Sequence, residues 1–163
     1  MEQSNEFTFR PMRRFKQALS PEECRDILDK AYRGFLSVIG DGGYPYSFPI
    51  NFYHEDGKVY FHSAMQGHKI DSLRACDKAC FTVLGEPEKE PGDWWYHVKS
   101  VICFGHLKEI TEAPKHDAML RKFGRKYFPG EEYLEKEMAE SARHAAVLEL
   151  TIEHMTGKSV REK

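Results

Sequence analysis

The sequence predicts a mainly β (α+β) protein, a small antiparallel barrel with peripheral helices, in which residues 1–163 form a single domain. Six runs rich in β-branched and aromatic residues are separated by short turns, and helical patterns are confined to a few segments. No repeat and no long linker divides the chain. With 163 residues, 40% of them hydrophobic, the chain is long enough to bury one sizeable core.

The first predicted element is a helix in the segment SPEECRDILDKAYRG. Ser20 is its expected N-cap, Pro21 its first residue and Glu23 the second member of a capping box, and Gly34 is the expected stop. Apolar residues recur at helical spacing, so one face of this helix is expected to pack on the sheet. That face comprises Cys24, Ile27, Leu28, Ala31 and Tyr32.

Three strands are predicted next, and the glycine turns between them favour an antiparallel meander. A short helix, two further strands, two helices and a final strand complete the expected order. The strands are expected at 35–40, 46–54, 59–64, 78–85, 94–110 and 145–154, and the later helices at 67–77, 114–128 and 131–143.

Charge and composition exclude several classes of function. The formal net charge of -2 gives no general attraction to nucleic acid or to an anionic membrane, so neither is an expected partner. The start of the chain has no apolar run of signal-peptide type, which favours a cytoplasmic protein. The four cysteines form no CxxC pair and are expected to be reduced thiols.

Two motifs suggest sites that their context does not support. TGKSV at 156–160 resembles part of a P-loop, but the upstream glycine position is Ile152. His54, His62 and His68 match no compact metal-ligand spacing, and the cysteines do not join them. No metal site is therefore expected.

The segment YFHSAMQGHKI forms the most informative corner of the sequence. A strand ending at Ala64, followed by Gly67 and a helix from His68, would direct free backbone N–H groups and the positive helix end at one point. Ser63, His68 and Lys69 would add side-chain donors. These features favour a phosphate site, although a glycine before a helix and a solvated lysine are also common on their own.

Two further features are compatible with a flat heterocyclic ligand. Pro49 cannot donate to a β-ladder, which indicates a sheet edge or opening where backbone groups of Pro49, Ile50 and Asn51 would face a ligand. Trp94 and Trp95 follow a polar loop with two prolines and would cover an aromatic ring. An ordinary edge proline and tryptophans in the core or at a dimer contact are the alternative interpretations.

Taken together, MRRFKQALS, GDGGYPYSFPINF, VYFHSAMQGHKIDSL, SVICFGHLKEI and IEHMTGK resemble, in order and approximate spacing, the pyridoxamine 5'-phosphate oxidase-like FMN-binding split-barrel family. The resemblance covers nearly the whole chain and is nearest to the nitroimidazole-resistance (Nim) flavoproteins. It implies a homodimer of six-stranded antiparallel split β-barrels with FMN in two clefts at the subunit interface.

The resemblance also implies which residues contact the cofactor. The FMN phosphate is expected at the segment matching His62, Ser63, Ala64, His68 and Lys69, and the isoalloxazine along Pro49, Ile50 and Asn51. The strand with Ser100 and Val101 is expected nearby, and residues near Trp94 would close the cleft from either chain.

The activity implied is that of an FMN-dependent oxidoreductase acting on a small electron-poor acceptor, as a nitroreductase or as a quinone or flavin reductase. The loop EPEKEPGDWWYH is richer in tryptophan than the Nim pattern, and TGKSVREK lacks the arginine motif associated with pyridoxamine phosphate oxidation. Neither a catalytic acid nor a base is assigned. A deazaflavin in place of FMN is a further possibility in this barrel.

The alternative function is a haem- or flavin-binding module of the same fold without turnover. A haem would need an axial ligand facing an apolar pocket. The candidates for that ligand are His62, His68, His97 and His106.

Overall fold

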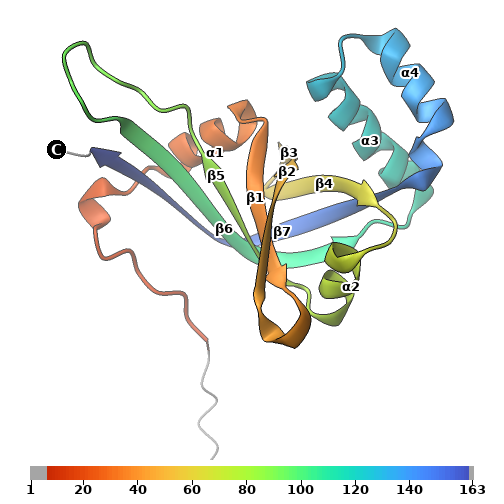
Figure 1. Cartoon of the computed structure of the whole chain (residues 1–163), viewed down its shortest axis with the longest axis horizontal. Helices are drawn as coiled ribbons and strands as arrows, with labels where there is room; N and C mark the ends of the chain where they lie inside the picture. Colours follow the sequence, from red (N-terminus) through yellow and green to blue (C-terminus); the bar gives the residue numbers. More distant parts are fainter. Residues whose placement is uncertain (1–6, 162–163) are drawn as a thin grey trace, which may run out of the picture.

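The computed structural model describes residues 7–161, which form one curled antiparallel sheet with four helices around it (Figure 1). The strand order is β2-β1-β5-β6-β7-β4-β3. The strands are β1 (Arg33–Ile39), β2 (Pro45–Asn51), β3 (Tyr53–Glu55), β4 (Lys58–Ala64), β5 (Lys78–Leu84), β6 (His97–Glu109) and β7 (Ala145–Arg161). The helices are α1 (Pro21–Lys30), α2 (His68–Ala75), α3 (Ala113–Tyr127) and α4 (Glu131–Glu140).

The predicted antiparallel split barrel with peripheral helices is confirmed as a curled half-barrel, with seven strands in place of six. The extra strand arises because the expected strand 46–54 is interrupted at Phe52. The backbone N–H of Phe52 donates to the hydroxyl of Tyr127 (2.9 Å), and its carbonyl accepts from the same hydroxyl (2.7 Å). A side chain from α3 therefore replaces the β-ladder at this residue.

The chain builds the sheet from two hairpins, β1–β2 and β3–β4, as the glycine turns predict. The predicted meander is confirmed in part: Tyr53 and His54 of the expected strand 46–54 pair with β4, but β2 does not, and the other neighbour of β4 is β7. β2 is thus an edge strand, which confirms the edge position predicted for Pro49. The two edge strands are β2 and β3, and β3 pairs only with residues 58–60 of β4, so the sheet is open between β2 and residues 61–64 of β4.

The capping box of α1 is present: the Glu23 amide donates to the Ser20 hydroxyl oxygen (3.2 Å), and the Ser20 amide donates to the Glu23 carboxylate (2.9 Å). The helix ends at Lys30, so the predicted stop at Gly34 is wrong. Gly34 lies inside β1, where a Cβ would overlap the ring of Phe81. Close strand packing, not helix termination, requires this glycine.

The buried residues form two groups on the two faces of the sheet. The larger one fills the barrel and includes Leu36, Phe61, Phe81 and residues of α1 and α2. The smaller one lies under α3 and contains Tyr60, Ile110, Met119, Phe123 and Val147. Met119 and Phe123 of α3 are buried in this group, with Leu120 and Tyr127 packed against it.

One residue predicted for the core differs from the structure. Tyr32 lies beyond the end of α1 and is 63% exposed, so it is not part of the helix face.

All four cysteines are free thiols, as predicted; Cys24 and Cys103 are buried, and Cys76 and Cys80 are half-buried. Among residues 7–161, no helix is long and apolar enough to span a membrane.

Candidate functional site

The corner between β4 and α2 has the predicted backbone geometry. β4 ends at Ala64, α2 begins at His68, and Gly67 between them has φ of 117°, a conformation that favours glycine. The amides of Ile70 and Asp71 donate to the Gly67 carbonyl at 2.9 and 3.1 Å. Helix geometry therefore leaves the N–H groups at 67–69 available for a ligand. No atom lies within 4 Å of a Cβ built on Gly67, so this backbone is open.

The side chains of His68 and Lys69 are positioned by aromatic residues of β2. The His68 ring stacks on Tyr46, with 4.2 Å between ring centroids and 13° between planes. The Lys69 Nζ lies 4.9 Å from the centroid of Phe48. These contacts hold the start of α2 beside the edge strand that carries Pro49, so two separately predicted segments lie side by side.

His62 and Asn51 line a cavity of about 360 Å³ between the sheet and the α3–α4 hairpin. The His62 ring lies edge-on to Phe123, with centroids 5.1 Å apart. The Arg33 Nε donates to the Asn51 Oδ1 at 2.9 Å, which leaves the Asn51 amide N–H₂ free to donate. Since successive side chains of a strand alternate in direction, Ser63 faces the opposite side of β4 from His62.

The charge state of His62 follows from its surroundings. Partial desolvation beside α3 lowers the pKa of His62, even though much of the residue is exposed, and the positive charge of Lys69 lowers it further. His62 is therefore neutral at pH 7, with one ring nitrogen that donates and one that accepts.

Ile50 and Val101 differ from the other candidates because their side chains are in the core. They are 8% and 0% exposed, respectively. Only their backbone groups are available to a ligand. Pro49 and Ala64 are exposed, and Ser63 is half-buried.

Ser100, Val101 and Trp94 do not join the corner within one chain. Ser100 pairs with Lys158 of β7, whereas His62 pairs with Val147 of the same strand. Eleven residues of strand correspond to roughly 35 Å. Ser100 instead lines a cavity of about 500 Å³ beneath the N-terminal segment 7–12.

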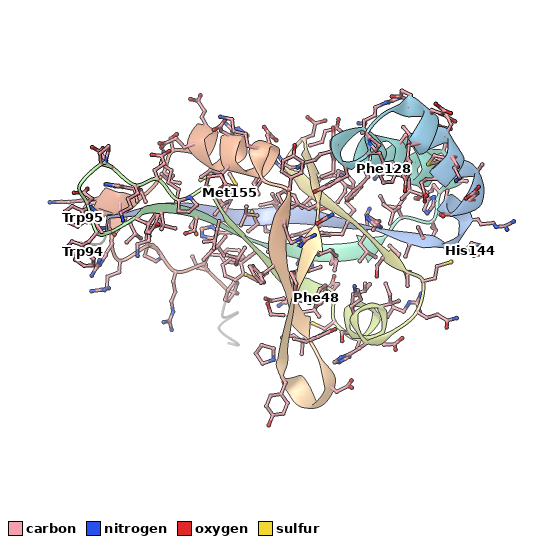
Figure 2. All side chains as sticks on the ribbon, turned by 45° about the horizontal axis from the view of Figure 1, so that its top comes forward. Phe48, Trp94, Trp95, Phe128, His144 and Met155 are labelled. Carbon is pink, nitrogen blue, oxygen red and sulfur yellow. The ribbon has the colours of Figure 1, made fainter. Side chains whose placement is uncertain are left out.

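The tryptophans lie at the same distant end of the molecule, in the loop between β5 and β6. Figure 2 shows Trp94 and Trp95 at the opposite end from Phe128 and His144. Trp94 is 71% exposed and meets the edge of Trp95, with centroids 5.6 Å apart. Its interpretation as a core residue is therefore wrong, while a contact with a second chain stays a prediction.

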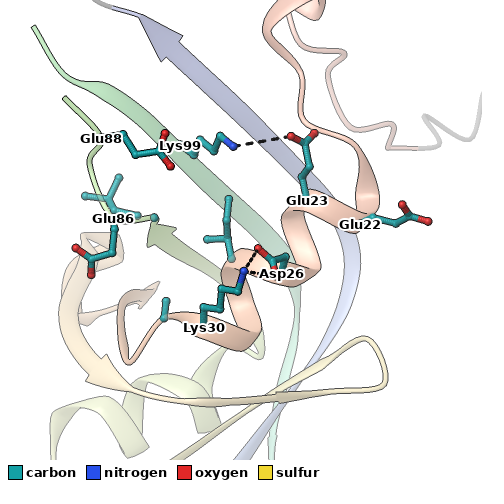
Figure 3. A pocket seen from close by; sticks show the side chains of 11 residues that line it. Glu22, Glu23, Asp26, Lys30, Glu86, Glu88 and Lys99 are labelled. Carbon is teal, nitrogen blue, oxygen red and sulfur yellow. Dashed lines mark hydrogen bonds and ion pairs between the residues drawn. The ribbon is translucent and has the colours of Figure 1, made fainter. Parts of the chain in front are cut away.

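A third cavity, of about 460 Å³, lies between α1 and the start of the β5–β6 loop (Figure 3). It was not predicted. Its carboxylates outnumber its two lysines, of which Lys30 is paired with Asp26 at 2.8 Å. Because the cavity is mainly acidic, it does not suit a phosphate or a flavin tail. The carboxylates are Glu22, Glu23, Asp26, Glu86 and Glu88.

The structure adds Tyr46, Phe48 and Phe123 to the surroundings of the predicted site. The alternation of Tyr46, Phe48 and Ile50 in the sequence would have placed the first two on one face of β2. No local pattern, however, indicates that α3 returns to cover His62, since that contact joins residues sixty positions apart.

Comparison with known families agrees with this architecture. A family model described as pyridoxamine 5'-phosphate oxidase matches residues 20–159. No curated protein matches the chain.

Several solved structures have a similar fold. A candidate 5-nitroimidazole antibiotic resistance protein from Bacteroides thetaiotaomicron is 23% identical, with a TM-score of 0.74, covering 87% of this chain and 86% of its own. An FAD-binding protein from Mesorhizobium loti is 24% identical (TM-score 0.64; 89% and 98% covered). A flavocytochrome from Azotobacter vinelandii is 23% identical (TM-score 0.74; 94% and 73% covered). At these identities the likeness shows a shared fold.

Proposed function

Because the chain belongs to the pyridoxamine 5'-phosphate oxidase family, we propose that it is an oxidoreductase that binds FMN and reduces a small electron-poor acceptor, such as a nitro compound or a quinone. The observation that carries this proposal is the corner at Gly67, where backbone N–H groups, Lys69 and His68 gather beside the edge strand β2. The neighbours named as FAD-binding and flavocytochrome proteins support a flavin in this fold.

The corner supplies the donors that a phosphate dianion needs. The N–H groups at 67–69 and the positive end of α2 favour a negative charge. Lys69 adds an ammonium group that has no carboxylate within salt-bridge distance in the described part of the chain. Ser63 adds a hydroxyl at the end of β4. We assign the phosphate to this donor set, with Ala64 beside it; the side chain of His62 faces the other side of β4, toward the cavity under α3.

The opening between β2 and β4 would hold the flavin ring. Backbone groups of Pro49, Ile50 and Asn51 lie along the edge strand, where polar atoms of a flat heterocycle find partners. A bound flavin supplies two-electron transfer between a reduced nicotinamide and the acceptor. For a quinone, the reduced nicotinamide provides one hydride and is oxidised, and the solvent provides one proton, so that the product is the hydroquinone.

A homodimer would complete the site. The outer face of β1, β5 and β6 exposes an apolar row in which Phe35 pairs with Thr82, and Thr82 with Ile102. Phe35 is 47% exposed, which is unusual for a side chain in the middle of a sheet. A second copy packed on this face would bring its Ser100 and Trp94 toward the first copy's cleft. Such a dimer would explain why Ser100 and Trp94 lie far from the Gly67 corner within one chain.

The first experiment is an absorption spectrum of the purified protein, before and after incubation with FMN and removal of the unbound ligand. Bands near about 370 and 450 nm that bleach with a reduced nicotinamide are expected. The Lys69→Gln variant should bind FMN about tenfold to hundredfold more weakly, since a charge-assisted hydrogen bond contributes about 1.5–3 kcal/mol. Lys78→Gln, at an exposed position of β5, is the matched control.

Two results would contradict the proposal. If the protein stays colourless after incubation with FMN or FAD, it does not bind a flavin and the proposed function is refuted. Equal FMN affinity in Lys69→Gln and the unchanged protein would mean that the phosphate does not bind at the corner. Chromatography of the released cofactor distinguishes FMN from FAD and from a deazaflavin.

The second candidate function, a haem-binding module without turnover, rests on His62. Of the four histidines considered as axial ligands, His62 faces the apolar cavity under α3, whereas His68 stacks on Tyr46 and His106 is held between Asp77 and Glu153. A Soret band that is lost in His62→Ala would place this function first.

A further inference from the structure

The α3–α4 hairpin encloses a cavity that neither the phosphate nor the flavin ring accounts for. Its volume is about 360 Å³, at the lower end of the range for small-molecule sites. Ser63, His68 and Lys69 are not among its lining residues, so it is distinct from the phosphate corner. His62 and Asn51 line it, and it therefore adjoins the edge where the flavin ring is proposed.

The walls of this cavity are built into the fold. Tyr127 fastens the end of α3 to the sheet through hydrogen bonds between its hydroxyl and the backbone of Phe52. Gly124 lets α4 approach, because a Cβ at this position would overlap the side chain of Leu134. Leu134 is 1% exposed and closes the side of the cavity away from the sheet. The hydrogen bonds of Tyr127 therefore anchor α3 to the sheet, and the close contact at Gly124 sets the position of α4, so that both helices keep the cavity open.

The lining defines the chemistry of an occupant. Most walls are apolar, including Phe123, which presents its ring beside His62. The free amide of Asn51 and the neutral ring of His62 can donate hydrogen bonds to an oxygen on the ligand. Glu137 is the carboxylate that lines the cavity, and it disfavours an anionic ligand.

We propose that this cavity binds the electron acceptor, and that the acceptor is a neutral, single-ring nitroarene or quinone whose oxygens meet Asn51 and His62. This inference rests on the proposed function and names the substrate class of that site. A whole nicotinamide dinucleotide is too large for the cavity, so the electron donor reaches the flavin from outside it. Met138 and Ala142, on the α4 side, limit the size of the ring.

The test reduces the cavity without touching the cofactor residues. Met138→Trp fills it from α4, and Ala142→Leu is a milder second variant at another lining position. Ala139→Trp is the matched control, because Ala139 is exposed and outside the lining. For nitrobenzene as the acceptor, the two cavity variants should raise KM at least tenfold. Their FMN content and the KM for reduced nicotinamide should stay within twofold of the unchanged protein.

A second measurement does not depend on turnover. With ¹³C-labelled methionine methyl groups, nitrobenzene should shift the Met138 signal, whereas Met155, outside the cavity, should not move. An unshifted Met138 signal would overturn the acceptor site even if the protein never binds a flavin. An unchanged KM in flavin-loaded Met138→Trp would overturn it while the proposed function stands. Loss of FMN in that variant alone would assign the cavity to the cofactor.

Discussion

Neutralising Glu149 should destabilise the protein in a pH-dependent way. Its carboxylate is 0% exposed and accepts hydrogen bonds from Lys115 and from Lys58, the latter at 3.0 Å, with Lys108 at 3.4 Å. Burial by itself raises the pKa of Glu149, but the two hydrogen-bonding lysines outweigh it and lower the pKa to about 2. From an ordinary value of 4.5, that difference corresponds to about 3 kcal/mol of folding free energy.

The sign follows from the lowered pKa of the folded state. The stabilisation by Glu149 is complete above about pH 4.5 and is lost as the pH falls toward about 2. In urea denaturation at pH 7, Glu149→Gln should therefore lose about 3 kcal/mol, and the difference from the unchanged protein should shrink below pH 4. Glu86→Gln, at an exposed loop position, should change the free energy of unfolding by less than about 0.5 kcal/mol. A deficit that is the same at pH 3 and pH 7 would refute the reasoning.

Two further substitutions test how the fold holds the site. Tyr127→Phe should cost about 1–3 kcal/mol in urea denaturation, because the Phe52 amide loses its hydrogen-bond partner; Tyr133→Phe, at an exposed tyrosine of α4, should cost almost nothing. Gly105→Ala should cost at least about 2 kcal/mol, since its Cβ would overlap a backbone carbonyl of β7, whereas Gly85→Ala meets only ordinary contacts. Equal melting temperatures within either pair would contradict the corresponding packing argument.

Local signals explain the parts of the fold that were predicted correctly. The capping box at Ser20 and the change of pattern at Gly67 each depend on a few neighbouring residues, and both helix starts are where the sequence places them. The end of α1 was misplaced because Gly34 satisfies a stop pattern while serving a packing contact between strands. A glycine alone does not distinguish these two roles.

In the candidate site, too, local sequence patterns predicted some parts and tertiary packing determines the others. The pattern of short segments identified the corner, and the structure brings its Lys69 next to the edge strand with Pro49. The cover provided by α3 depends on tertiary packing that no short segment encodes. Ser100 was grouped with the corner by resemblance to a family, but the register of β6 places it beside Lys158, far along β7 from the residues that pair with β4.

The long strand β7 also constrains when the protein can fold. It pairs with β6 on one side and β4 on the other, so it alone joins the half-sheet β2-β1-β5-β6 to the hairpin β3–β4. Until residues 145–151 have emerged from the ribosome, β4 lacks its main partner and both half-sheets present open edges. Closure must therefore follow synthesis of β7, and the contacts that it makes are distant in sequence, which slows folding. During that interval the unpaired strand edges are open to pairing with other chains.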